Sequence, residues 1–101
     1  GCTSSCAHFN PFKNKHGGRN SKERHVGDLG NIISKNNLAK GHMYDNEISL
    51  NCHSRRCIIG RCVVIHEDED DLGKGGDEES LKTGNAGKRV GCGVIGLTKK
   101  C

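Results

Sequence analysis

The chain of 101 residues has room for one domain, and only 32% of its residues are hydrophobic. So short and polar a chain buries little apolar surface, and we expect metals, disulfides or a partner subunit to stabilise it. The formal net charge of +4 is modest and no basic stripe carries interleaved aromatic residues, so we expect no nucleic-acid partner. No apolar run is long enough to cross a membrane, so we expect no membrane partner either.

The predicted elements are short strands joined by long loops. Residues 1–31 are polar and glycine-rich, without helical or strand periodicity, which is typical of a long functional loop. Residues 67–88 return to this loop composition. Between and after the loops, short runs rich in β-branched residues predict strands. We expect these strands at residues 32–33, 47–50, 57–66 and 89–97, which makes the fold all-β.

The first of these loops carries three histidines and one aspartate within 21 residues: His8, His16, His25 and Asp28. Three imidazoles and one carboxylate provide the four ligands of a tetrahedral Zn²⁺ site. Gly27 lets the backbone turn so that His25 and Asp28 converge. A single loop histidine is usually only solvated, but this set predicts a bound metal. Four protein ligands would close the coordination shell, which favours structural zinc.

Four further polar residues stay ambiguous on composition alone. His66 ends the most apolar segment and is either a histidine packed at a strand end or a ligand. Asp70 and Asp71 are either solvated loop residues or partners of a ligand imidazole, whose second nitrogen normally needs one. Arg89, at the start of the last strand, is either a surface charge or a group that guides anions.

The cysteines are odd in number, so at least one is free or pairs between chains. They form no Cys-x-x-Cys motif and do not group with the histidines, which argues against a cysteine-rich zinc finger. The cysteines are Cys2, Cys6, Cys52, Cys57, Cys62, Cys92 and Cys101.

A series of short blocks, in order from the first residue almost to the last, matches one known family. The blocks are residues 1–4, 8–11, 16–18, 23–31, 58–61, 63–67, 70–76, 78–80, 82–87 and 92–96. They resemble the copper/zinc superoxide dismutases, and only residues 32–57 match loosely. The resemblance implies that family's Greek-key β-barrel or sandwich. Residues 1–101 would be a single, N-terminally incomplete domain that holds the C-terminal strands and the zinc-binding and electrostatic loops.

The resemblance also implies an oxidoreductase that dismutates superoxide to O₂ and H₂O₂ with Zn²⁺ and Cu²⁺/Cu⁺ as cofactors. His8 would bridge the two metals and His66 would be a copper ligand. Arg89 would dock the superoxide anion beside the copper. Zinc would be held by His8, His16, His25 and Asp28.

Further family features fall on other residues. Asp70 would link a zinc-ligand histidine to a copper-ligand histidine, and Cys2 and Cys92 would form a disulfide. The electrostatic loop would span residues 73–87, where Thr83 would narrow the substrate channel. The charges that shape the field there would be Glu78, Glu79 and Lys82.

The chain departs from the family in one important respect. It contains no His-x-His motif, which in the family supplies two copper ligands, so only His8 and His66 remain for copper. We therefore expect part of a complete enzyme. The alternative is a truncated, redox-inactive zinc-binding relative or interaction domain of the same family. The family further implies a homodimer, a cytoplasmic location and possible service by a copper chaperone.

Overall fold

The computed structural model describes residues 2–98, so Cys101 lies outside the described residues. Two strands, β1 (Cys62–His66) and β2 (Arg89–Val94), pair antiparallel. Two short 3₁₀ helices accompany them, η1 (Cys2–Ser5) and η2 (Glu79–Leu81). The predicted all-β class is confirmed at this level, because the only helical residues described are these single turns.

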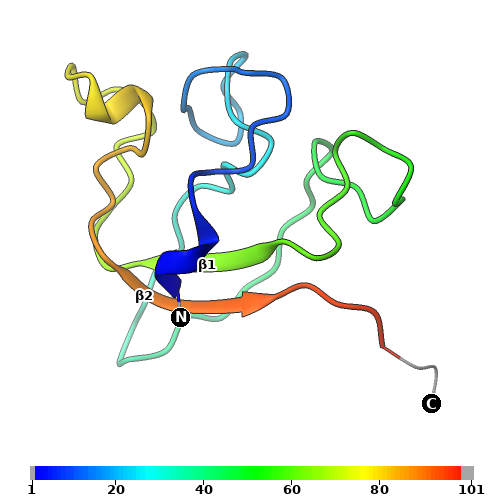
Figure 1. The fold of residues 1–101 in the computed structure, drawn as a ribbon. Helices are drawn as coiled ribbons and strands as arrows, with labels where there is room; N and C mark the ends of the chain where they lie inside the picture. The colour runs from blue at the N-terminus through cyan, green and yellow to red at the C-terminus, as the bar shows by residue number, and fades with distance from the viewer. Residues whose placement is uncertain (1, 99–101) are drawn as a thin grey trace.

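The β1–β2 pair is the frame from which three loops rise (Figure 1). We call residues 6–31 the first loop, residues 67–88 the second loop and residues 51–61 the central loop. All three stand on the same side of the strand pair, and η1 lies across it (Figure 1). The second loop joins the end of β1 to the start of β2, so its two ends are fixed by the sheet.

The register of the sheet places polar groups at one end of the pair. Cys62 pairs with Val94 at one end, and His66 pairs with Arg89 at the other. A register irregularity falls between Ile65 and His66, where one extra residue on β2 bulges out. His66 and Arg89 are therefore brought opposite each other at the two ends of the second loop.

The strand predictions are only partly correct. The segment 57–66 forms a strand only from Cys62, because the chain turns before it, with Gly60 at a φ of 85°. The segment 89–97 ends as a strand at Val94. Around residue 49 the pairing is limited to one parallel bridge between Ser49 and Cys57.

The prediction of a strand at Ile32 and Ile33 is wrong. These side chains are 62% and 78% exposed, and their backbone has no strand to pair with in the described part of the chain. Beyond them the chain reverses at Asn36-Asn37, both with positive φ, between the bridged residues Lys35 and Leu38. This is the geometry of a two-residue hairpin turn.

The buried residues of the molecule are mostly polar. Val26 and Ala86 are the buried apolar side chains among residues 2–98. The buried polar group is larger and consists of His16, Arg24, His25, Asp28 and Ser80. Polar contacts within the loops, rather than an apolar core between sheets, hold this part of the fold together.

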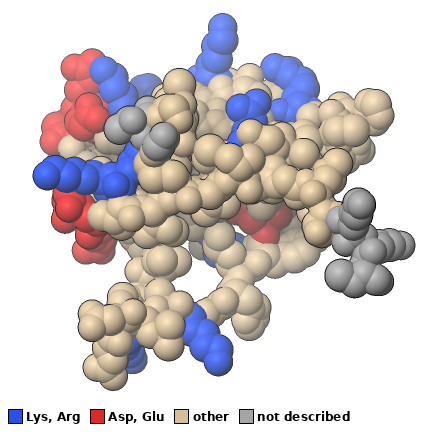
Figure 2. Space-filling view, turned by 60° about the horizontal axis from the view of Figure 1, so that its bottom comes forward, with Lys and Arg blue, Asp and Glu red and all other residues tan. Residues whose placement is uncertain are grey.

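Charged side chains are unevenly spread over the surface. On the face shown in Figure 2, acidic residues gather at one edge, where basic residues accompany them, and other lysines and arginines are scattered. None of the helices among the described residues is long or apolar enough to span a bilayer.

Candidate metal centre

The predicted ligands of the first loop converge on one point. The Nδ1 atoms of His8 and His16 each lie 3.0 Å from Asp28 Oδ1, and that of His25 lies 3.2 Å away. The Nδ1 atoms of His8 and His25 are themselves 3.1 Å apart. One ligand atom from each of the four residues fits within a span of 4.8 Å. Three nitrogens thus crowd a single carboxylate oxygen.

Backbone hydrogen bonds hold this geometry in place. Asp28 uses its second oxygen, Oδ2, to accept the amides of Gly17 at 3.1 Å and His25 at 2.8 Å. The amide of Gly27 donates to the Phe9 carbonyl at 2.9 Å, which returns the chain to the residue next to His8. The carboxylate is therefore fixed on one side by the backbone and faces the three imidazoles on the other.

The second loop reaches the same site through Asp70. Its Oδ1 lies 2.7 Å from His16 Nε2, the ring nitrogen that points away from Asp28. Gly84 makes this approach possible, because a Cβ built on it would lie 1.9 Å from Asp70 Oδ1 and 2.5 Å from His16 Nε2. Of the two acidic residues left open by the sequence, Asp70 contacts a ligand imidazole. Asp71 instead accepts hydrogen bonds from Ser80 and Asn85.

The electrostatics of the site keep its carboxylate ionised. Burial would raise the pKa of Asp28, but the adjacent rings of His16 and His8 and the amides of Gly17 and His25 lower it far below its usual range. Burial lowers the pKa of His16, yet the adjacent carboxylates of Asp28 and Asp70 raise it to about 9. For His25, burial is the largest influence and the pKa is lowered.

These residues fit a metal ion. Of the buried side-chain nitrogen and oxygen atoms described, His16 Nδ1 is the one without a hydrogen-bond partner, although Asp28 Oδ1 lies 3.0 Å away. Three imidazole nitrogens and a buried carboxylate around one point form the donor set that Zn²⁺ prefers. The partner of His16 Nε2, Asp70, is the outer hydrogen bond that a ligand histidine usually makes.

The residues predicted for the copper side lie next to this cluster. The rings of His8 and His66 are 6.3 Å apart between centroids. His66 Nδ1 lies 2.9 Å from the Gly87 carbonyl oxygen, so Nδ1 is the hydrogen-bond donor. The other ring nitrogen, Nε2, then carries a free lone pair. His8 directs Nδ1 to Asp28, so its Nε2 also remains available for a second metal.

Arg89 lies beside this pair but is also tied to the chain start. Its Nη1 donates to the Cys2 carbonyl at 2.6 Å, and its Nη2 donates to the Cys6 carbonyl. A guanidinium has five N–H groups, so other donors remain for an anion. The predicted disulfide is confirmed: Cys2 and Cys92 are bonded, with Cα atoms 5.7 Å apart.

The residues predicted for the electrostatic loop lie on and next to η2, at the surface of the second loop. Lys82 Nζ pairs with Glu78 Oε1 at 3.5 Å, and both side chains are exposed. Thr83 donates from Oγ1 to Glu79 Oε1 at 3.0 Å. Both pairs lie at the surface, and no hydrogen bond or ion pair among the described residues joins them to the histidine cluster.

Sequence reasoning missed two supports of the site. Asn31 exchanges two hydrogen bonds with the backbone of Asp70, at 2.9 and 3.0 Å, and so holds the residue that contacts His16. Arg24 is buried and pairs with Asp45 at 3.0 Å while donating to carbonyls of the first loop. Asn31 could have been identified from the block 23–31, which resembles the family. Nothing in the sequence near Arg24 or Asp45 indicates that these two residues pair.

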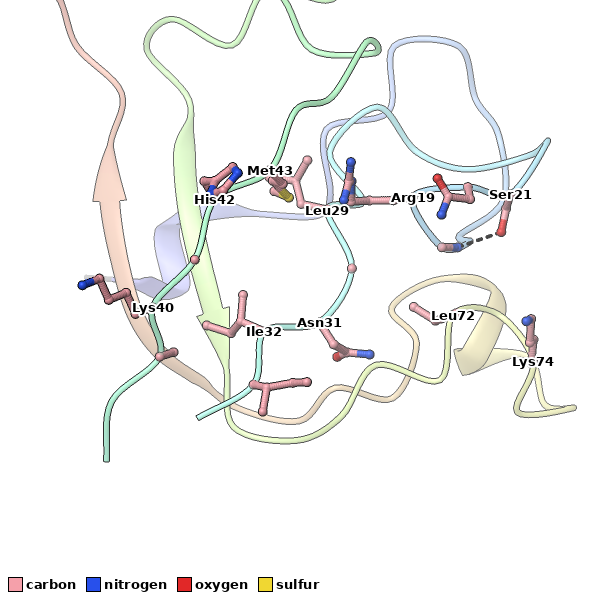
Figure 3. Close-up of a pocket in the computed structure, with 16 residues that line it drawn as sticks. Arg19, Ser21, Leu29, Asn31, Ile32, Lys40, His42, Met43, Leu72 and Lys74 are labelled. Carbon is pink, nitrogen blue, oxygen red and sulfur yellow. Dashed lines mark hydrogen bonds between the residues drawn. The ribbon is translucent and has the colours of Figure 1, made fainter. Parts of the chain in front are cut away.

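A surface hollow lies away from the histidine cluster. It has a volume of about 1030 Å³, and Figure 3 shows Leu29, Ile32, Met43 and Leu72 among the side chains around it, with Arg19, Lys40 and Lys74 nearby. None of the four clustered ligands lines it.

Comparison with known proteins agrees with this geometry. The family model described as copper/zinc superoxide dismutase matches residues 1–95. A superoxide dismutase [Cu-Zn] of Paramecium bursaria Chlorella virus 1 is 63% identical over 101 residues, which are 99% of this chain and 53% of that protein. The superoxide dismutase [Cu-Zn] of Yarrowia lipolytica is 59% identical over 99 residues, covering 97% of this chain and 63% of that protein.

A crystal structure of the clock protein EA4 superposes with a TM-score of 0.91 at 49% sequence identity, covering 97% of this chain and 62% of that one. The chain therefore belongs to the copper/zinc superoxide dismutase family, and the resemblance stated from its sequence blocks is confirmed. The chain spans about half to just under two thirds of the length of these relatives.

Proposed function

We propose that this chain provides the zinc site and part of the copper site of an enzyme that dismutates superoxide to O₂ and H₂O₂. The observation that carries the proposal is the convergence of three imidazole nitrogens on one oxygen of Asp28, with a second pair of histidine nitrogens left free beside it. Relatives at 59–63% identity bear the name superoxide dismutase. That name does not favour the redox-inactive alternative.

In this proposal, zinc is held by His8, His16, His25 and Asp28. Zinc does not change oxidation state, so its role is to fix the ring of His8. The hydrogen bonds of Gly17 and His25 to Asp28 Oδ2, together with Asp70 at His16, orient the ligands toward one point.

Copper is assigned to the Nε2 atoms of His8 and His66. Copper held there would supply the one-electron redox chemistry by which one superoxide is oxidised to O₂ and another is reduced, with two protons, to H₂O₂. His8 Nε2 is a nitrogen on which this chain can hold a proton for the reduced product. The Gly87 carbonyl fixes the ring of His66 through Nδ1.

Arg89 is assigned to bind the superoxide anion, because this cationic residue pairs with His66 in the sheet register. Glu78, Glu79, Lys82 and Thr83 are assigned to shape access through the second loop. We further propose that β1 and β2 belong to a Greek-key barrel of the family type, in a cytoplasmic homodimer that a copper chaperone could load. These assignments rest on family membership.

The test is to purify the complete enzyme to which this chain is proposed to contribute, load it with zinc and copper, measure both metals by elemental mass spectrometry, and follow superoxide decay after pulse radiolysis. We expect His66→Ala to lose copper and copper-dependent dismutation while keeping zinc. His53→Ala, which changes an exposed histidine outside the site, should leave all three unchanged. Dismutation by His66→Ala at the wild-type rate would refute the copper assignment. Zinc binding without any dismutation in the wild-type protein would support the redox-inactive alternative.

A further inference from the structure

Two free cysteines line a single surface hollow of the central loop. Cys52 and Cys57 both border a hollow of about 560 Å³, together with the side chains of Arg55 and Arg61. Cys52 is exposed and Cys57 is partly exposed, so small solutes reach both thiols. Neither cysteine has a role in the proposed dismutation.

The backbone of the central loop turns back on itself between the two cysteines. Successive turns close at Ser54 N to the Asn51 carbonyl, at 3.0 Å, and at Cys57 N to the Ser54 carbonyl, at 3.1 Å. The segment then returns to Ser49, whose amide donates to the Arg56 carbonyl at 3.0 Å. Cys57 therefore lies beside Ser49, only three residues before Cys52 in the chain.

The hollow also provides the environment in which cysteines react with oxidants. Reactive thiols are partly exposed and lie near cations, whereas inert cysteines are buried in apolar surroundings. Arg55 and Arg61 supply the cations here. Cys62 makes a useful contrast, because it is exposed on β1 but does not line the hollow.

We propose that Cys52 and Cys57 form a dithiol site that hydrogen peroxide oxidises to an intramolecular disulfide. One thiol releases its proton and the thiolate attacks a peroxide oxygen; the O–O bond breaks, the sulfur becomes a sulfenic acid, and the departing hydroxide takes up that proton and leaves as water. The second thiol releases its proton and its thiolate attacks that sulfur, forming the S–S bond; the S–O bond breaks and the hydroxide leaves with the second proton as a second water. Both sulfurs are oxidised and the peroxide is reduced to two waters. The site goes beyond dismutation and works with added peroxide.

The disulfide would act on the neighbouring first loop. The central loop carries Arg55 and Arg56, whose guanidinium carbons lie 4.8 and 4.6 Å from the centre of the Phe12 ring. Arg55 also donates to the Pro11 carbonyl at 3.2 Å. A ring closed between Cys52 and Cys57 contains both arginines, so oxidation restrains the segment that holds Phe12.

The two arginines also make the proposal easy to test. Trypsin cleaves after Arg55 and Arg56, so Cys52 leaves in the peptide 41–55 and Cys57 in the peptide 57–61. After stoichiometric hydrogen peroxide and alkylation of remaining thiols, we expect these two peptides to stay joined in monomeric protein, with a mass loss of two hydrogens. Amide exchange of residues 9–14 should slow in the same sample.

Variants separate this site from general thiol oxidation. Cys52→Ser should abolish the joined peptides and leave Cys57 to oxidise further, to the sulfinic acid. Cys62→Ser should leave the joined peptides unchanged. The proposal is overturned if both thiols are alkylated after peroxide, if each is oxidised separately, or if the joined peptides occur only in covalent dimers.

Discussion

Among single residues, Arg24 and Asp45 are the charged pair whose burial has the clearest consequence for stability. The guanidinium side chain is 6% exposed and the carboxylate side chain 3%, so neither is well solvated. Arg24 also donates to the carbonyls of Arg19, His25 and Val26, which fixes the backbone next to a predicted zinc ligand. The pair therefore links residue 45 to the first loop.

This pair predicts an acid-dependent loss of stability. Burial raises the pKa of Asp45, but hydrogen bonds from Arg24 and the Glu47 amide outweigh it and lower the pKa below 3.8. Since the folded-state pKa is depressed, the stabilisation is present above pH 3.8 and is lost as the pH falls further. Asp45→Asn should lower the unfolding free energy at pH 7 by about 3 kcal/mol and weaken its fall in acid. Denaturant unfolding across pH 2–7 checks this, and Glu69→Gln, at an exposed acid, is the control whose equal effect would contradict it.

Arg89 carries a second prediction at this scale. Arg89→Gln removes a positive charge from the residue that pairs with His66, so superoxide should be captured about tenfold more slowly. This factor is at the lower end of the range for electrostatic steering, for which this family is a recognised example. The dependence of the rate on salt should weaken as well. Lys88→Gln removes an exposed charge one residue away and should change the rate little. Equal rates for wild type and Arg89→Gln would remove Arg89 from the anion site.

At the scale of elements, the first and second loops are joined at one crowded contact. His16 comes from one loop and Asp70 from the other, and Gly84 leaves the space in which they meet. The contact depends on a glycine because its φ of 72° and the nearby atoms both exclude a side chain.

Gly84→Ala should therefore separate the loops and weaken zinc binding. Loss of an outer hydrogen bond to a metal ligand typically costs about 10–100-fold in metal affinity. Competition with a chromophoric chelator measures this. Gly76→Ala is a matched control, because Gly76 also has a positive φ, of 84°, but has open space around its Cβ position. An equal loss in both variants would indicate backbone strain in place of a lost contact.

The sequence could predict the parts of this site that are local. His8, His16, His25 and Asp28 lie in one loop with glycines between them, so their spacing alone indicated a metal site. The strand predictions failed where strand formation depends on pairing with another strand. Ile32 and Ile33 have β-branched side chains but have no partner strand in residues 2–98. Arg24 and Asp45 are 21 residues apart and have no periodic relation. Only the folded loops bring them together.

At the scale of the whole molecule, the Cys2–Cys92 disulfide joins the start of the described chain to β2. It spans 90 residues of sequence, so it restricts the unfolded chain strongly. Chain-entropy estimates for such a loop give about 4–5 kcal/mol of stabilisation. Arg89 reinforces the link, because it donates to the carbonyls of Cys2 and Cys6.

Cys2→Ser should therefore lower the unfolding free energy by up to about 4 kcal/mol and weaken zinc binding, since it frees the segment that precedes His8. Thermal unfolding and chelator competition measure the two effects. Cys6→Ser removes an exposed free thiol from the same segment and should change neither. If Cys2→Ser bound zinc as tightly as wild type, the disulfide would be irrelevant to the metal site.

The buried hydroxyl of Ser80 has a consequence for how such a protein matures. Ser80 is fully buried; its Oγ donates to Asp71 at 2.6 Å and accepts the Gly75 amide at 2.9 Å, while its own amide donates to Asp77 at 2.8 Å. These bonds close the second loop on itself and use no metal ligand. These hydrogen bonds can order the loop without a metal ion, so the free energy of metal binding is not needed to order it.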